Sequence, residues 1–103
     1  MNALALLAHV ALGATRPDKF LAADARVAIS RMLNDPASAQ YQNLRVEGDK
    51  ICGEVNARNR AGGYDGFMTF YGVIEANGTV TIRELDKPDQ YETAKASCYK
   101  AGL

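Results

Sequence analysis

Two short turn signals, each flanked by alternating apolar and polar residues, restrict the middle of the chain to antiparallel hairpins. The turns are Gly48-Asp49 and Asn77-Gly78, and Asn-Gly is a strong signal for a two-residue hairpin turn. Alternation with a period of two is typical of a strand that buries one face. The pattern therefore predicts a four-stranded antiparallel meander, with its sheet within residues 43–83. The four alternating runs are residues 44–47, 50–58, 67–75 and 79–83.

A helix is predicted before the sheet, over residues 17–34. Thr15 is a residue type common at helix N-caps, and a proline early in a helix is favourable. The segment Asn34-Asp35-Pro36 ends the helix, because the residue before a proline is pushed out of the helical region. At about 100° per residue, the apolar side chains form one stripe that we expect to pack on the sheet. The stripe consists of Leu21, Ala22, Ala25, Ala28, Ile29, Met32 and Leu33.

A second helix is predicted after the sheet, over residues 87–101. Lys87-Pro88-Asp89 opens it, and Gly102 ends it. Its apolar stripe is Tyr91, Ala94, Cys98 and Ala101. Together the elements predict an α+β fold, in which an N-terminal helix or helices pack on a four-stranded antiparallel meander that is followed by a C-terminal helix.

Length and charge narrow the range of functions. A chain of 103 residues is expected to form a single domain, residues 1–103, with one hydrophobic core. Twelve Lys and Arg residues balance twelve Asp and Glu residues and are mixed along the chain. Since no basic block is present to neutralise phosphates, we expect no nucleic-acid partner.

The first residues contain an apolar run, ALALLAHVAL at positions 3–12. This run falls short of the ~20 residues that span a bilayer, so no membrane span is expected. Residues 1–14 have two interpretations. As a processed export signal, which here lacks a preceding Lys or Arg, they would make the protein periplasmic or secreted. As an N-terminal helix of the mature fold, they would leave it in the cytoplasm.

The two cysteines do not have the spacing of a metal site. Alternation places Cys52 and Glu54 on one strand face and Ile51 and Val55 on the other. Cys98 is 46 positions further along, and a single histidine cannot complete a tetrahedral zinc site. Spacing alone leaves open a disulfide in an oxidising compartment or two buried thiols in a reducing one.

Catalytic pairs are not apparent. His9 lies within the apolar run, and no Ser or Cys stands in a recognisable nucleophile motif. The acidic pairs Glu84 with Asp86 and Asp89 with Glu92 lie near a predicted helix start, where acids favour the helix dipole. We therefore predict no catalytic residues, no metal and no cofactor.

The segment 56–67, with the sequence NARNRAGGYDGF, is the strongest candidate for a working surface. Three glycines in five residues allow backbone conformations closed to other residues. A phosphate-binding loop is excluded, because no Lys-Ser or Lys-Thr follows and the segment leads into a strand. The segment is either a connection that closes the sheet or a binding loop. The residues assigned to binding are Arg58, Asn59, Arg60, Tyr64 and Asp65.

Three sequence strings and the late Cys98 resemble a group of small uncharacterised proteobacterial proteins. The strings are DPASAQYQN at 35–43, CGEVNARN at 52–59 and GGYDGF at 62–67. Many members of that group carry an export signal or lipoprotein anchor, and we expect relatives in phages. The resemblance implies a periplasmic or envelope setting and a disulfide between Cys52 and Cys98. This chain lacks the basic start and the lipobox cysteine of exported members.

We therefore expect a small non-enzymatic binding protein of the cell envelope or of phage origin. It would engage a protein partner through the 56–67 loop and the adjacent sheet surface. The alternative is a small hydrolase-like or transfer enzyme. A deep pocket with a strongly perturbed acid would favour the enzyme, whereas an aromatic-rimmed surface would favour the binding protein.

Overall fold

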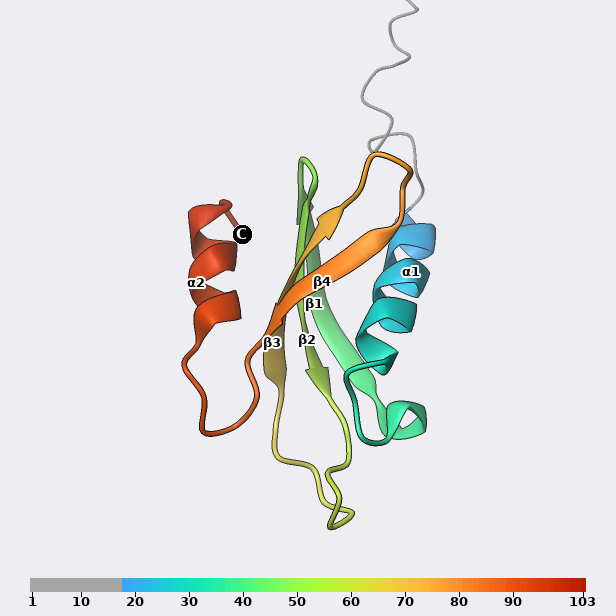
Figure 1. Cartoon of the computed structure of the whole chain (residues 1–103), viewed down its shortest axis with the longest axis vertical. Coiled ribbons are helices and arrows are strands. Elements are labelled where there is room, and N and C mark those ends of the chain that lie inside the picture. The colour runs from blue at the N-terminus through green and yellow to red at the C-terminus, as the bar shows by residue number, and fades with distance from the viewer. Residues whose placement is uncertain (1–17) are drawn as a thin grey trace, which may run out of the picture.

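The computed structural model describes residues 18–103, with side chains from residue 22 onward, and it has the α+β architecture that the sequence predicts (Figure 1). The four strands form one antiparallel sheet in the order β1-β2-β3-β4, which confirms the predicted meander. Residues 1–14, with their two interpretations, lie outside the described residues. The elements are α1 (Asp18–Ser30), the short 3-10 helix η4 (Pro36–Ser38), β1 (Gln40–Glu47), β2 (Lys50–Asn56), β3 (Met68–Ile74), β4 (Val80–Leu85) and α2 (Thr93–Lys100).

The two helices cover opposite faces of the sheet, so the molecule has three layers (Figure 1). Helix α1 packs mainly against β4, and its buried residues Ala25 and Ile29 enter the hydrophobic core with the inner side chains of the strands. The part of the predicted stripe that contains Ala25 and Ile29 therefore faces the sheet. The core residues of the sheet on this face are Ile51, Val55, Phe70, Ile74, Val80 and Leu85.

Gly53 in β2 makes room for the ring of Phe70, the largest fully buried side chain, to lie over the β2 backbone. It pairs with Phe70 of β3, and a Cβ at residue 53 would lie 2.5 Å from Cζ of the Phe70 ring. Any larger residue would therefore displace the ring. Phe70 is 1% exposed, so this close approach is made in the centre of the core.

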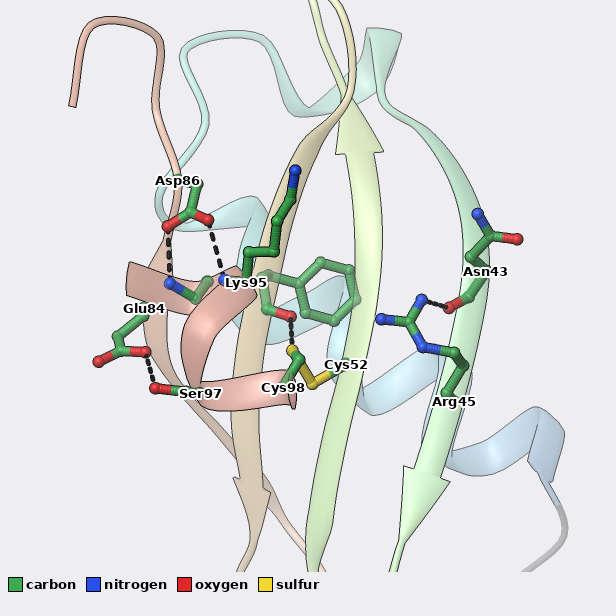
Figure 2. The surroundings of a disulfide bond; sticks show 10 residues. Asn43, Arg45, Cys52, Glu84, Asp86, Lys95, Ser97 and Cys98 are labelled. Atoms are coloured by element: carbon green, nitrogen blue, oxygen red, sulfur yellow. Dashed lines mark hydrogen bonds between the residues drawn. A yellow bond between two sulfur atoms is a disulfide. The ribbon is translucent and has the colours of Figure 1, made fainter. Parts of the chain in front are cut away.

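Helix α2 lies on the other face and is joined to it covalently. Cys52 of β2 and Cys98 of α2 form a disulfide, with their Cα atoms 6.1 Å apart (Figure 2). Both cysteines are buried, as is Ala94. The hydroxyl of Ser97 adds a hydrogen bond of 2.6 Å to Oε1 of Glu84 in β4. The disulfide that the resemblance implied is thus present.

The helix ends differ from the predicted ones. Helix α1 ends at Ser30 rather than at residue 34, because the next turn tightens and the amide of Met32 bonds to Ile29 O at 2.8 Å. Met32 therefore leaves the predicted stripe and is 36% exposed. The other stripe residues beyond Ala25 and Ile29 are half-buried where their side chains are described.

Helix α2 begins at Thr93 rather than at residue 87. Asp89 takes a positive φ of 65°, which interrupts a helix at that point. Tyr91 therefore lies before the helix and is 90% exposed, which corrects its assignment to the buried stripe. The sheet spans residues 40–85 rather than 43–83, with a bulge between Gln42 and Arg45 of β1. No helix within residues 18–103 has the length and apolar character to cross a bilayer.

Candidate functional site

The 56–67 loop is a folded extension of the β2–β3 hairpin. Arg58 and Tyr64 form an isolated antiparallel bridge beyond the ends of the two strands. Further out, the amide of Asn59 donates to Gly63 O at 2.8 Å, and the amide of Gly62 donates to Asn59 O at 2.9 Å. Gly62 has a φ of 91°, a conformation that suits glycine. The tip of the loop is therefore closed by its own backbone.

The side chain of Asn59 braces this tip from inside. Its Oδ1 accepts hydrogen bonds from the amides of Ala61 (2.9 Å) and Gly63 (3.1 Å). Its Nδ2 donates to Oδ1 of Asp65 at 2.9 Å. Two of the residues assigned to binding, Asn59 and Asp65, thus hold the shape of the loop.

Tyr64 attaches the loop to the 3-10 helix η4. The Tyr64 hydroxyl donates to Ser38 O at 2.9 Å, and the amide of Arg58 donates to Ser38 Oγ at 2.8 Å. The guanidinium carbon of Arg58 lies 5.7 Å from the centroid of the Tyr64 ring, a cation–π arrangement. Tyr64 is still 42% exposed, so its ring remains accessible beside Arg58.

Asn56 closes the base of the loop, a role that the sequence did not suggest. It is 9% exposed, and its Oδ1 accepts a hydrogen bond of 3.2 Å from the amide of Gly66. Gly66 has a φ of 106°. The sequence offered one indication of this role, a polar side chain at the end of an alternating run. Such a residue is equally common on a solvated strand face, so the pattern does not identify it as buried.

A pocket of about 190 Å³ opens beside the base of the loop, and we call it the loop-base pocket. It forms where the segment after α1, the start of the loop, the start of β3 and the segment after β4 meet. Its apolar lining consists of Met32, Leu33, Ala57, Met68, Leu85 and Pro88. Its polar lining consists of Asn34, Arg58, Asn59, Arg60, Asp65 and Lys87.

Positive charge dominates the polar side of the loop-base pocket. Arg58, Arg60 and Lys87 are all exposed, and none takes part in the ion pairs of the described part of the chain. Asp65 is the one acidic residue of the lining, and its carboxylate already accepts the Asn59 hydrogen bond. The site therefore combines an apolar floor with a cationic rim.

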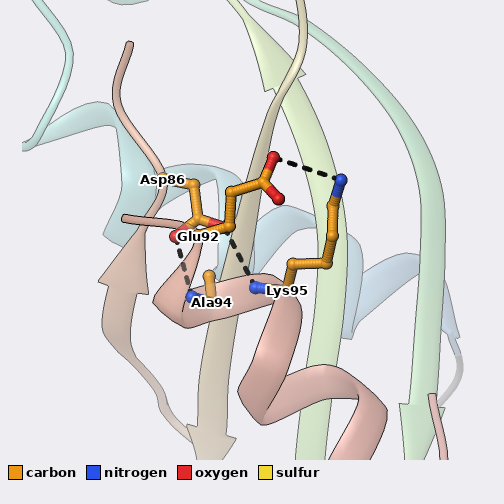
Figure 3. A network of polar contacts seen from close by, with 4 residues as sticks. All are labelled: Asp86, Glu92, Ala94 and Lys95. Carbon is orange, nitrogen blue, oxygen red and sulfur yellow. Dashed lines mark hydrogen bonds and ion pairs between the residues drawn. The ribbon is translucent and has the colours of Figure 1, made fainter. Parts of the chain in front are cut away.

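A second pocket, of about 250 Å³, lies between the end of the loop and the segment that leads into α2. Its acidic residues include Asp86, whose two carboxylate oxygens accept hydrogen bonds from the amides of Ala94 (2.7 Å) and Lys95 (3.0 Å) (Figure 3). Glu92 pairs with Lys95 at 3.3 Å. These contacts secure the first turn of α2, so Asp86 and Glu92, two of the four acids of this pocket, have a structural role.

A shifted carboxyl pKa is found in a part of the described chain away from these two pockets. A hydrogen bond from Lys50 lowers the pKa of the Asp49 carboxyl. Asp49 is in the exposed β1–β2 turn and lines neither of these two pockets. Within residues 18–103, no group of three or more His, Cys, Asp or Glu residues is placed to hold a metal ion.

The five residues assigned to binding all lie on this one loop, and four of them line the loop-base pocket. Sequence reasoning missed Met32, which it placed on a buried helix face, and Lys87, which it placed in a helix. No family model, curated protein or solved structure matches the chain.

Proposed function

We propose that this protein is a small non-enzymatic binding module that engages a protein partner through the 56–67 loop and the loop-base pocket. The observation that carries the proposal is that the loop is exposed and yet braced by its own hydrogen bonds. The side chain of Asn59 makes three of them, and the Tyr64 hydroxyl ties the loop to η4. A surface that is already ordered loses little conformational entropy on binding, which favours affinity.

The exposed side chains are of the types that dominate protein interfaces. Arg58, Arg60 and the rings of Tyr64 and Phe67 are accessible, with Phe67 44% exposed. Arginine and aromatic residues are enriched among interface hot spots. A braced loop that presents them supports a binding role better than a role in closing the sheet.

The disulfide supports an oxidising setting for this function. Structural disulfides persist in the periplasm and outside the cell and are rare in the cytosol. A periplasmic, envelope or secreted location is therefore part of the proposal, and a phage-encoded origin is compatible with it.

Partner capture from the native host tests the role of the loop. The bait is the disulfide-intact protein, and the test variant is Arg60→Ala. Arg60 is chosen over Tyr64 and Asn59 because it makes none of the hydrogen bonds described for residues 18–103. The matched control is Arg83→Ala, an exposed arginine in β4.

We expect Arg60→Ala to reduce capture at least about tenfold, as for an interface hot spot, while its melting temperature stays within a few degrees of the parent. Arg83→Ala should capture as the parent does. Undiminished capture by Arg60→Ala would move the working surface away from the loop.

A further inference from the structure

We infer that the loop-base pocket receives one apolar side chain of an acidic peptide segment, whose carboxylates lie against Arg58, Arg60 and Lys87. This inference rests on the proposed function and names the class of partner that the site selects. The inference follows from three observations: the volume of the pocket, the burial of its apolar lining residues and the charge around its opening.

The floor of the pocket is suited to a single apolar anchor. Ala57 and Leu85 are each 8% exposed, whereas Met32 at the edge is 36% exposed. Met68 and Leu33 are partly buried against the core. A ligand side chain would therefore lie on core residues and be covered by Met32, whose flexible thioether adapts to the shape of its contact.

The volume favours a peptide side chain over a long acyl chain. About 190 Å³ is below the range of ~300–1,000 Å³ typical of small-molecule sites. It is enough for one large apolar side chain of a longer ligand that continues across the surface. The three cations belong to two segments of the chain, 58–60 and 87, so they match several anionic groups rather than one carboxylate.

The charge at the opening selects the sign of the ligand. The whole chain has equal numbers of acidic and basic residues, but the pocket lining contains three cations and one acid. The acid, Asp65, is hydrogen-bonded to Asn59. Complementary charge across an interface directs association and rejects partners of like charge, so an acidic segment is favoured and a basic one is opposed.

A titration followed by amide chemical shifts tests this inference on the disulfide-intact chain. The probe is a short, terminally blocked peptide in which one leucine is flanked by aspartates. One comparison peptide carries lysines in place of the aspartates, and another carries serine in place of the leucine. We expect the aspartate peptide to shift the amides of Ala57, Met68 and Leu85, with affinity at least about tenfold above that of either comparison peptide.

Charge reversal then identifies the rim. Arg60→Glu should weaken binding of the aspartate peptide by about tenfold or more and should favour the lysine peptide. Arg83→Glu is the matched control on β4 and should leave both affinities unchanged. Rising salt should weaken binding of the two peptides that carry aspartates and should not weaken binding of the lysine peptide, because salt screens the attraction between exposed opposite charges.

Three results would overturn the inference: equal affinity for the aspartate and lysine peptides, shifts confined to another surface, or no saturable shifts with any peptide. Decanoate, titrated in the same way, tests for an acyl ligand. Saturable amide shifts with decanoate but not with the aspartate peptide would assign the pocket to an acyl chain. If no peptide binds while Arg60→Ala still loses host-partner capture, the binding function stands and only the ligand class fails. If the peptides bind as expected while capture is unchanged, the proposed function fails instead.

Discussion

The two helices are held on the two faces of one sheet by different means. Helix α1 inserts Ala25 and Ile29, both almost fully buried, among the apolar side chains of the strands. Helix α2 has eight residues and buries only Ala94 and Cys98. It is attached by the disulfide to Cys52 and by hydrogen bonds that α2 donates to the carboxylates of Glu84 in β4 and of Asp86 in the segment that follows it.

This difference teaches how a small domain covers both faces of its sheet. A helix shorter than about 12 residues is marginal by itself in water, and the small apolar area of α2 cannot compensate for the entropy of ordering it. A covalent bond and a few directional hydrogen bonds take the place of a second core. Small exported domains commonly use disulfides in this way.

Removal of the disulfide is expected to have the largest effect. The bond closes a loop with a sequence separation of 46 residues, for which the chain-entropy relation gives about 4 kcal/mol of stabilisation. We expect the Cys52→Ala, Cys98→Ala double variant to lose about that much free energy of unfolding in urea titrations. Amide exchange should accelerate most over α2, while α1 stays comparatively protected.

The double variant also provides the control for reduction. Reductant should destabilise the parent protein by a similar amount and leave the double variant unchanged. A double variant that unfolds at the same urea concentration as the parent would show that α2 is held by packing after all.

Truncation of the α1 core contact is expected to come next. Ile29→Ala should lower the free energy of unfolding by about 2–4 kcal/mol, since it removes a fully buried side chain and leaves a cavity. The matched control is Val27→Ala, an aliphatic change in the same helix at a position that is 55% exposed. It should cost less than about 0.5 kcal/mol. Equal losses at the two positions would mean that α1 is rotated from the orientation described above.

Removal of the carboxylate that caps α2 should have a smaller effect. Asp86→Ala leaves the amides of Ala94 and Lys95 without their acceptor, and loss of a cap of this kind costs about 1 kcal/mol. The control is Glu92→Ala, which removes only the exposed ion pair with Lys95 and should cost less than about 0.5 kcal/mol. Urea titrations of the two variants compare them directly. A loss at Glu92 as large as that at Asp86 would contradict the capping role.

The smallest expected effect is the loss of folding stability at alkaline pH that comes from ionisation of Tyr41. Burial raises the pKa of the Tyr41 phenol above its usual 10.0, and the nearby Arg26 offsets part of that rise. The guanidinium carbon of Arg26 lies 5.0 Å from the centroid of the Tyr41 ring. Because the folded protein disfavours the phenolate, this contribution to stability is full below pH 10 and is lost as the pH rises through the raised pKa.

Comparison with Tyr41→Phe isolates this contribution. The variant should lose less stability than the parent between about pH 9 and pH 12 in urea titrations, because phenylalanine cannot ionise. An identical decline in the two proteins would show that Tyr41 titrates as an ordinary exposed phenol.

The elements that the sequence predicts well are those specified by neighbouring residues. The β1–β2 and β3–β4 hairpins follow from the alternation of apolar and polar residues next to Gly48-Asp49 and Asn77-Gly78. The buried face of α1 follows from the helical spacing of its apolar residues. The start of α2 was missed because Asp86 caps it from eight and nine positions away. Such a contact has no signature within the helix itself.

The candidate site shows the same limit. The composition of residues 56–67 identified the loop, but not the division of work within it. Asn59 and Tyr64 brace the loop through contacts that include Ser38, 26 positions before Tyr64. The loop-base pocket needs Met32 and Lys87 to meet beside the loop, and only the assembled sheet brings them together.

The bond between Cys52 and Cys98 also determines how the molecule would respond to mechanical force. Tension applied at the two ends of the chain would pass from β2 directly into α2 through the sulfur atoms, and it would bypass the residues between the two cysteines, whose sequence separation is 46. Those positions correspond to roughly 150 Å of extended chain that could not be pulled out while the bond is intact. The 56–67 loop lies wholly within this bypassed stretch, so a partner that pulls on the ends of the protein would not stretch the loop.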